Sequence, residues 1–184
     1  MKYNEVLLIG ADDSNHAGVN KQGEINTIVA SFLKEDGIVS NFPNRRDFEE
    51  TKKWLKNTER DYRFTLLFGE SYRHSSSNLI YSVPLLIEKF LEEKDLDVKT
   101  IKIFLDGPLK KGGREEIRNF FLGKRGIENV VVDNFIKKNK GDNGRTAKHM
   151  VCPPVLYYAD VISNILYHTE MGESLIHEKL RLIK

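Results

Sequence analysis

Four acidic side chains stand where the chain could bring them together: Asp12, Glu70, Asp106 and Asp160. Three of them end or follow short apolar runs typical of strands, and the fourth lies in an apolar helical segment. Ligands of α/β sheets bind at strand ends, so acids placed in this way can converge on one point. Converging carboxylates favour a hard divalent cation, which indicates chemistry assisted by Mg²⁺ or Mn²⁺.

The first acidic pair, Asp12-Asp13, follows Val6-Leu7-Leu8-Ile9, a run typical of a strand buried on both faces. Side chains alternate along a strand, so the two acids cannot point the same way. Acidic residues and the Ser14-Asn15 that follow are also ordinary turn formers, so the pair either belongs to a site or stops the strand. Asp13 is either a second metal ligand or a turn cap.

Asp106 precedes Gly107-Pro108 and is followed closely by Lys110, Lys111 and Arg114. One interpretation is a turn with a surface ion-pair cluster, which contributes little to stability. The other is the rim of a phosphodiester site, where cations hold phosphates beside a metal.

Asp160 lies at the edge of a predicted helix that is strongly apolar, so full exposure of this carboxylate to solvent is not expected. It belongs either to a site or to a local pair with the hydroxyl of Tyr157 or the amide of Asn164. Glu70 is open in the same way, because a surface pair with Arg73 explains it equally well.

The five histidines lack the paired spacing of a metal site. His16, beside the first acids, and His149, in the basic segment 137–149, are candidate proton shuttles because imidazole titrates near neutral pH. The single cysteine, Cys152, excludes a disulfide framework and an all-cysteine metal site.

The predicted elements form an α/β fold. Strands at 25–32 and 38–42 follow the first strand and complete a three-strand antiparallel meander. Strands at 62–68, 100–106 and 129–136 then alternate with helices at 47–56, 79–91 and 114–122, and Pro84 either starts or kinks the second helix. A helix opening at Pro153-Pro154 carries Asp160, and another helix ends the chain. The alternation predicts parallel pairing and helices on both faces of a mixed sheet.

Length and composition set bounds on the function. The 184 residues, 40% hydrophobic and 30% charged, are typical of one globular domain spanning 1–184. The formal charge of +2 does not by itself indicate nucleic-acid binding. No apolar run has the length of a membrane span and the N-terminus is unlike a signal peptide, so we expect a cytoplasmic protein without a membrane partner.

Together these features resemble the ribonuclease H-like superfamily of metal-dependent nucleases. In that family a meander strand carries the first Asp, matched here by Asp12, and a C-terminal helix carries the last, matched by Asp160. Asp-Asp-Ser and Tyr-Ala-Asp-Val are similar to an uncharacterised prokaryotic branch with an Asp-Glu-Ser start, an Ala-Asp helix and an intermediate strand ending in Asp, as at Asp106. The resemblance favours Asp12 over Asp13, and His149 occupies the place of a mobile histidine.

The sequence departs from that branch at three points. Asp13 replaces Glu, Tyr157-Tyr158 replaces Gln-Leu, and no Glu opens the predicted helix at 79–91. The intermediate carboxylate is therefore Glu70, Asp106 or both.

The resemblance implies two Mg²⁺ or Mn²⁺ ions about 4 Å apart flanking a phosphodiester, one activating water and one stabilising the leaving 3′ oxygen. It implies Asp12, Asp106, Asp160 and His149 as catalytic groups, with Asp13 and Glu70 as further metal ligands. The implied nucleic-acid contacts are Lys110, Lys111, Arg114, Lys138, Lys140, Arg145 and Lys148.

Two other functions stay open. One is a catalytically silent ribonuclease H-like module that binds nucleic acid or a protein partner, with a homodimer as one form. The other is a nucleotide-handling fold with one Mg²⁺, which is less favoured because the chain has neither a P-loop nor a dinucleotide-binding glycine motif.

Overall fold

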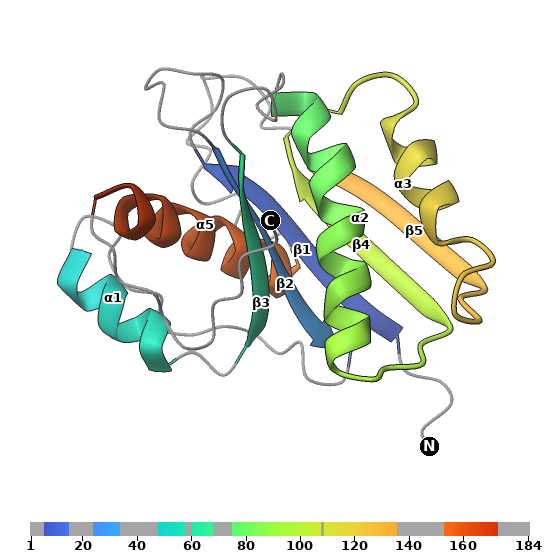
Figure 1. Cartoon of the computed structure of the whole chain (residues 1–184), viewed down its shortest axis with the longest axis horizontal. Coiled ribbons are helices and arrows are strands. Elements are labelled where there is room, and N and C mark those ends of the chain that lie inside the picture. The colour runs from blue at the N-terminus through green and yellow to red at the C-terminus, as the bar shows by residue number, and fades with distance from the viewer. Residues whose placement is uncertain are drawn as a thin grey trace.

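The computed structural model describes residues 6–14, 24–33, 48–57, 60–67, 75–107, 109–135 and 153–172. Within them a five-stranded sheet lies between two layers of helices (Figure 1). The strands are β1 (Val6–Ser14), β2 (Glu24–Phe32), β3 (Asp61–Leu67), β4 (Thr100–Asp106) and β5 (Asn129–Phe135). The helices are α1 (Phe48–Asn57), α2 (Ser75–Glu93), α3 (Gly113–Phe121) and α5 (Pro154–Gly172).

The sheet is mixed and open, with strand order β3-β2-β1-β4-β5. β2 pairs antiparallel with both β1 and β3, whereas β4 pairs parallel with both β1 and β5. The carboxyl ends of β1 and β4 therefore lie at the same edge of the sheet, beside the start of β2. This edge is where the predicted acids of β1 and β4 meet.

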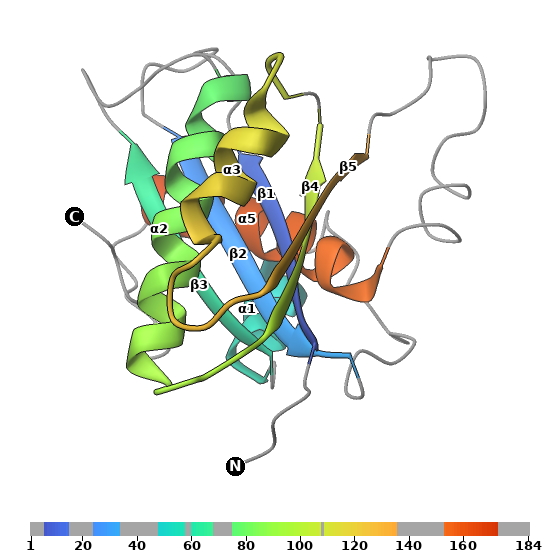
Figure 2. The same cartoon turned by 90° about the vertical axis from the view of Figure 1, so that its right-hand side faces the viewer.

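One face of the sheet packs against α2 and α3, as Figure 2 shows from the side. Burial alternates along β4, so every second residue faces these helices and the intervening residues are half-buried. The apolar side chains that form this core include Leu7, Ile9, Val83, Ile87, Ile101 and Ile103. The prediction of helices on both faces is confirmed.

The other face packs against α5, with α1 beyond it. Its core contains Ile25, Val29, Phe64, Ala159 and Ile162, all buried. α5 can be buried in this way because it is apolar around most of its circumference.

The backbone of α5 lies very close to the sheet at Gly10 of β1. A Cβ atom built on Gly10 would lie 2.1 Å from the backbone oxygen of Val155. Any larger residue at this position would push helix and strand apart, so glycine is required by the close approach of two backbones.

The pairing of β3 differs from the prediction. The segment 38–42 lies outside the described residues, and β3 is the strand next to β2. The strand predicted at 62–68 within the parallel part is therefore antiparallel. β1 already pairs with β2 on one side and with β4 on the other, so β3 joins the sheet beside β2 instead.

α2 is longer than predicted. It begins at Ser75, inside the predicted polar loop, and continues through Pro84. A proline inside a helix costs about 3 kcal/mol. Each fully buried aliphatic side chain contributes about 1.5–3 kcal/mol, so the buried stripe containing Leu79, Val83 and Ile87 offsets that cost.

Among the helices of the described segments, none is both long enough and apolar enough to cross a lipid bilayer.

We predict that Gly10→Ala lowers the free energy of unfolding by about 2–3 kcal/mol, because the new methyl group meets backbone atoms of Val155. Urea unfolding followed by circular dichroism measures the change. Gly113→Ala is the matched control, because its Cβ would meet the flexible end of Ile80 and the loss should be smaller. Equal stability of Gly10→Ala and the natural chain would contradict the close packing of α5 on β1.

Candidate metal centre

β1 continues through both acids of the Asp12-Asp13 pair. Its pairing with β2 extends to Ser14, opposite Ile25, so neither acid belongs to a turn that stops the strand. Acidic residues are poor strand formers, and the strand is carried past them by its partner rather than by local preference. Asp12 shares the α5 face with Gly10, and Asp13 lies on the opposite face.

Asp106 is brought beside Asp12 by the parallel pairing of β1 and β4. The register pairs Gly10 with Phe104 and Ala11 with Leu105, and its next step places Asp12 next to Asp106. Both side chains then project from the same face of the sheet.

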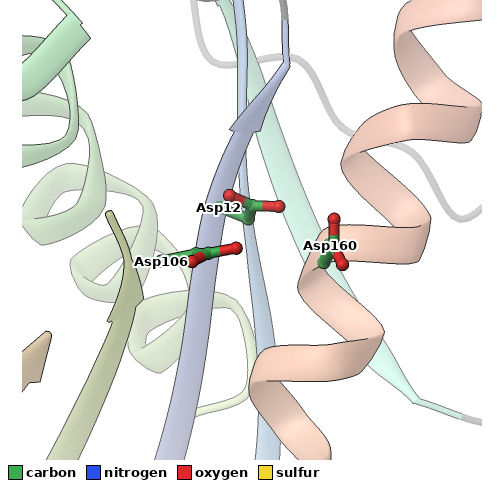
Figure 3. A group of neighbouring side chains, drawn as sticks. All are labelled: Asp12, Asp106 and Asp160. Atoms are coloured by element: carbon green, nitrogen blue, oxygen red, sulfur yellow. The ribbon is translucent and has the colours of Figure 1, made fainter. Parts of the chain in front are cut away.

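Asp160 completes the cluster from α5. The three carboxylates of Asp12, Asp106 and Asp160 each offer one oxygen, and these oxygens all lie within 4.8 Å of one another. Figure 3 shows Asp12 and Asp106 side by side on the sheet and Asp160 facing them from the helix. These residues, predicted from distant parts of the sequence, do meet in space.

The cluster is buried on one side and accessible on the other. Asp12 is 5% exposed, whereas Asp106 and Asp160 are half-buried. The Ser163 hydroxyl, one helical turn after Asp160, donates to Oδ2 of Asp12 at 3.4 Å. A ligand would therefore approach from the side of Asp106 and Asp160 and meet Asp12 at the inner end.

Three carboxylates at this separation repel one another when all are ionised, because part of the site is removed from water. A divalent cation neutralises two of the charges and converts the repulsion into attraction. Among the residues that the structure describes, the donor set consists of carboxylate oxygens, which fits Mg²⁺ or Mn²⁺ and is unlike the nitrogen and sulfur ligands typical of zinc.

Asp13 belongs to a different buried polar group, beneath α2. It lies opposite Asn26 on β2, and the neighbouring Glu24 is fully buried. The Asn26 amide donates to Glu24 Oε1 at 2.5 Å, and the Asn78 amide donates to Oε2 at 3.0 Å. Ser82 donates to Asn26 Oδ1 at 2.5 Å. The structure therefore separates Asp13 from the Asp12 cluster by the thickness of the sheet.

Sequence reasoning missed Glu24. The predicted strand starts at residue 25, whereas Glu24 begins β2 and is 0% exposed. Its only sequence signal is its alternation with Asn26, one strand step away. This alternation indicates a buried polar pair only when α2 is known to cover this face of the sheet.

The predicted cations after β4 have different partners. Lys110 forms an ion pair with Glu116 at 3.1 Å and lies over the ring of Tyr81, and the Glu116 hydrogen bond is the main cause that raises the pKa of Lys110. Arg114 instead donates through Nε to the neutral Asn134 Oδ1 at 2.7 Å. Lys111 is exposed.

Asn134, on the α3 face of the sheet, joins Arg114 to the backbone that follows Asp106. Its amide nitrogen donates to the backbone oxygen of Gly107 at 3.2 Å, and Gly107 directly follows Asp106. The Arg114 guanidinium is thus held at the carboxyl end of β4 by a group that does not neutralise its charge.

The other predicted site residues lie outside the described part of the chain: His16, Glu70, Lys138, Lys140, Arg145, Lys148 and His149. Their roles stay predictions.

No protein-family model matches this sequence, and no curated protein is significantly similar to it.

We predict that Asp106→Asn stabilises the metal-free protein by about 1 kcal/mol, because it removes one of three mutually repelling charges. Thermal unfolding at neutral pH with a chelator measures the effect. Asp133→Asn on the neighbouring strand, where Asp133 is exposed, is the control and should change little. A lower melting temperature for Asp106→Asn would show that the cluster is not under electrostatic strain.

Proposed function

We propose that this chain is a ribonuclease H-like, divalent-metal-dependent phosphodiesterase that hydrolyses nucleic acid. The observation that carries the proposal is the convergence of Asp12, Asp106 and Asp160 within 4.8 Å. A cluster of carboxylates from two adjacent strands and a facing helix is the donor set that phosphoryl-transfer sites use to hold their cations.

The strand arrangement supports the same proposal. The resemblance to the ribonuclease H-like superfamily implies a first strand that carries the primary Asp and has an antiparallel neighbour. It also implies a later helix that carries the last Asp. β1 carries Asp12 and pairs antiparallel with β2, and α5 carries Asp160. The position of Asp106 at the end of β4, within the carboxylate cluster, supports it as an intermediate carboxylate, which the sequence left to Glu70, Asp106 or both.

When bound, the cation would supply Lewis-acid stabilisation of the charge that develops on the phosphodiester and would acidify the attacking water. The protein's own groups have other roles. Asp12 forms the inner wall of the site, while Asp106 and Asp160 form the accessible rim that meets the substrate side. Close packing of α5 on β1 keeps Asp160, on the helix, near the strands that carry Asp12 and Asp106.

Arg114 is the best candidate for a phosphate contact outside the acid cluster. Arginine presents five N–H donors in a planar fork, and the described hydrogen bonds of Arg114 use two of these donors on one neutral oxygen of Asn134. The remaining donors and the full positive charge are suited to a phosphate. The charge of Lys110, in contrast, is offset by Glu116.

A catalytically silent binding module is the second candidate. The formal charge of +2, modest for a nucleic-acid enzyme, favours it. Calorimetry with Mn²⁺ separates the two functions: binding at millimolar affinity or tighter supports the enzyme, and no binding supports the module.

We predict that Asp160→Asn reduces Mn²⁺-dependent cleavage of labelled oligonucleotides by more than about 100-fold, because losing one ligand removes several kcal/mol of transition-state stabilisation. RNA, DNA and hybrid substrates are compared in the same assay, and circular dichroism confirms the fold. Asp133→Asn should retain the natural activity. Unchanged turnover by Asp160→Asn would refute the metal-centre assignment.

We also predict that Arg114→Ala weakens oligonucleotide binding by about tenfold and lowers the salt dependence by about one phosphate contact. Lys110→Ala is the matched comparison and should have a smaller effect, because Glu116 already pairs with Lys110. Fluorescence anisotropy at several salt concentrations gives both quantities. An equal effect of the two substitutions would show that Arg114 has no special place beside the site.

A further inference from the structure

A buried hydroxyl lies beside Asp12 on the side away from Asp106. Thr27 of β2 stands directly opposite Asp12 in the antiparallel register, on the α5 face of the sheet. In such a pair the Cβ atoms lie about 5 Å apart. Thr27 is 0% exposed, and its Oγ1 has no hydrogen-bond partner among the residues that the structure describes.

A second buried hydroxyl approaches the same carboxylate from the helix. Ser163 of α5 is 1% exposed, and its Oγ lies 3.4 Å from Asp12 Oδ2 and 3.2 Å from the backbone oxygen of Asp160. Both contacts are long for an O–H···O hydrogen bond, and one hydroxyl hydrogen serves the two acceptors. The carboxylate of Asp12 is therefore flanked by two buried hydroxyls, of which only that of Thr27 has no hydrogen-bond partner among the described residues.

The position of Thr27 in the sheet makes its hydroxyl unusual. The register places Phe64, Thr27 and Asp12 in one row across β3, β2 and β1, so Thr27 separates the apolar core from the acid cluster. Valine has the same shape and suits a buried strand position better, because it leaves no hydroxyl unsatisfied. Buried polar groups in native proteins generally have a partner, so this hydroxyl points to a bound state in which it acquires one.

We propose that Thr27 and Ser163 are positioning residues of the cation site. Their hydroxyls hold the inner oxygen of Asp12 when a cation draws its other oxygen toward Asp106 and Asp160. This inference rests on the proposed metal centre and adds which residues tune it. Hydrogen bonds behind a metal-binding carboxylate typically change the metal affinity by about 10–100-fold.

The test is Mn²⁺ titration calorimetry together with thermal unfolding in a chelator. For Thr27→Val we expect the Mn²⁺ affinity to fall by about 10–100-fold. The metal-free melting temperature should nevertheless rise by about 2–4 °C, because an unsatisfied buried hydroxyl is removed. Thr27→Ser keeps the hydroxyl and should bind Mn²⁺ within about threefold of the natural affinity, well inside the range expected for a lost hydrogen bond. Ser163→Ala should weaken Mn²⁺ binding as Thr27→Val does.

Tyr62→Phe is the matched control. Tyr62 lies on the same sheet face, opposite Val29, and its buried hydroxyl also has no partner among the described residues. It belongs to the apolar cluster around α5, where burial raises the pKa of its phenol well above the ordinary value. Removing this hydroxyl should raise the melting temperature in the same way but leave the Mn²⁺ affinity unchanged.

Each other outcome overturns the inference. Natural affinity in Thr27→Val and Ser163→Ala, with Mn²⁺ binding to the natural chain, refutes the positioning role and leaves the metal centre standing. A fall in both affinity and melting temperature in Thr27→Val shows a general loosening instead. Absence of Mn²⁺ binding by the natural chain refutes this inference and the proposed function together.

Discussion

The contact between α5 and β1 at Gly10 is the constraint on which the rest of the site depends. The helix backbone lies so close to the strand that even a methyl group at position 10 would meet Val155. Asp160 lies five residues further along α5 and Asp12 two residues further along β1. Because a helix and a strand are both stiff over such short spans, the contact at Gly10 determines how near the two carboxylates can come.

That proximity has an electrostatic cost which the rest of the fold must offset. The three carboxylates repel one another, and Asp12 is almost completely removed from water. Apolar cores on both faces of the sheet hold the strands and α5 together in spite of this repulsion. Local destabilisation of this kind is usual where a protein has to bind a cation, since the same charges that repel each other in its absence attract it.

The two faces of the sheet bury different polar groups. Beneath α2, the carboxylate of Glu24 accepts hydrogen bonds from two amides, which accounts for both of its oxygens. Beneath α5, the hydroxyl of Thr27 has no partner within the described residues although it faces Asp12. A satisfied network stabilises a core, whereas a donor left beside a carboxylate is suited to a site that changes on binding. The physical ground for assigning the ligand to the α5 face is the convergence of Asp12, Asp106 and Asp160 on that face.

The amino-acid sequence by itself determined the element types and the acids that end them. Apolar runs such as 6–9 and 100–105 specify strands, and the apolar circumference of 154–166 specifies a buried helix, because these patterns are local. Two predictions were wrong because they depend on long-range packing. α2 begins at Ser75 rather than near Leu79, and β3 pairs antiparallel with β2. Asp12 and Asp13 are adjacent in the chain, and the alternation of side chains along a strand shows only that they lie on opposite faces of the sheet. Strand register and the packing of α5 on Gly10 decided which of the two meets Asp106 and Asp160. The register also placed Thr27 beside Asp12. Register and helix packing depend on contacts between residues far apart in the chain, and no local pattern encodes them.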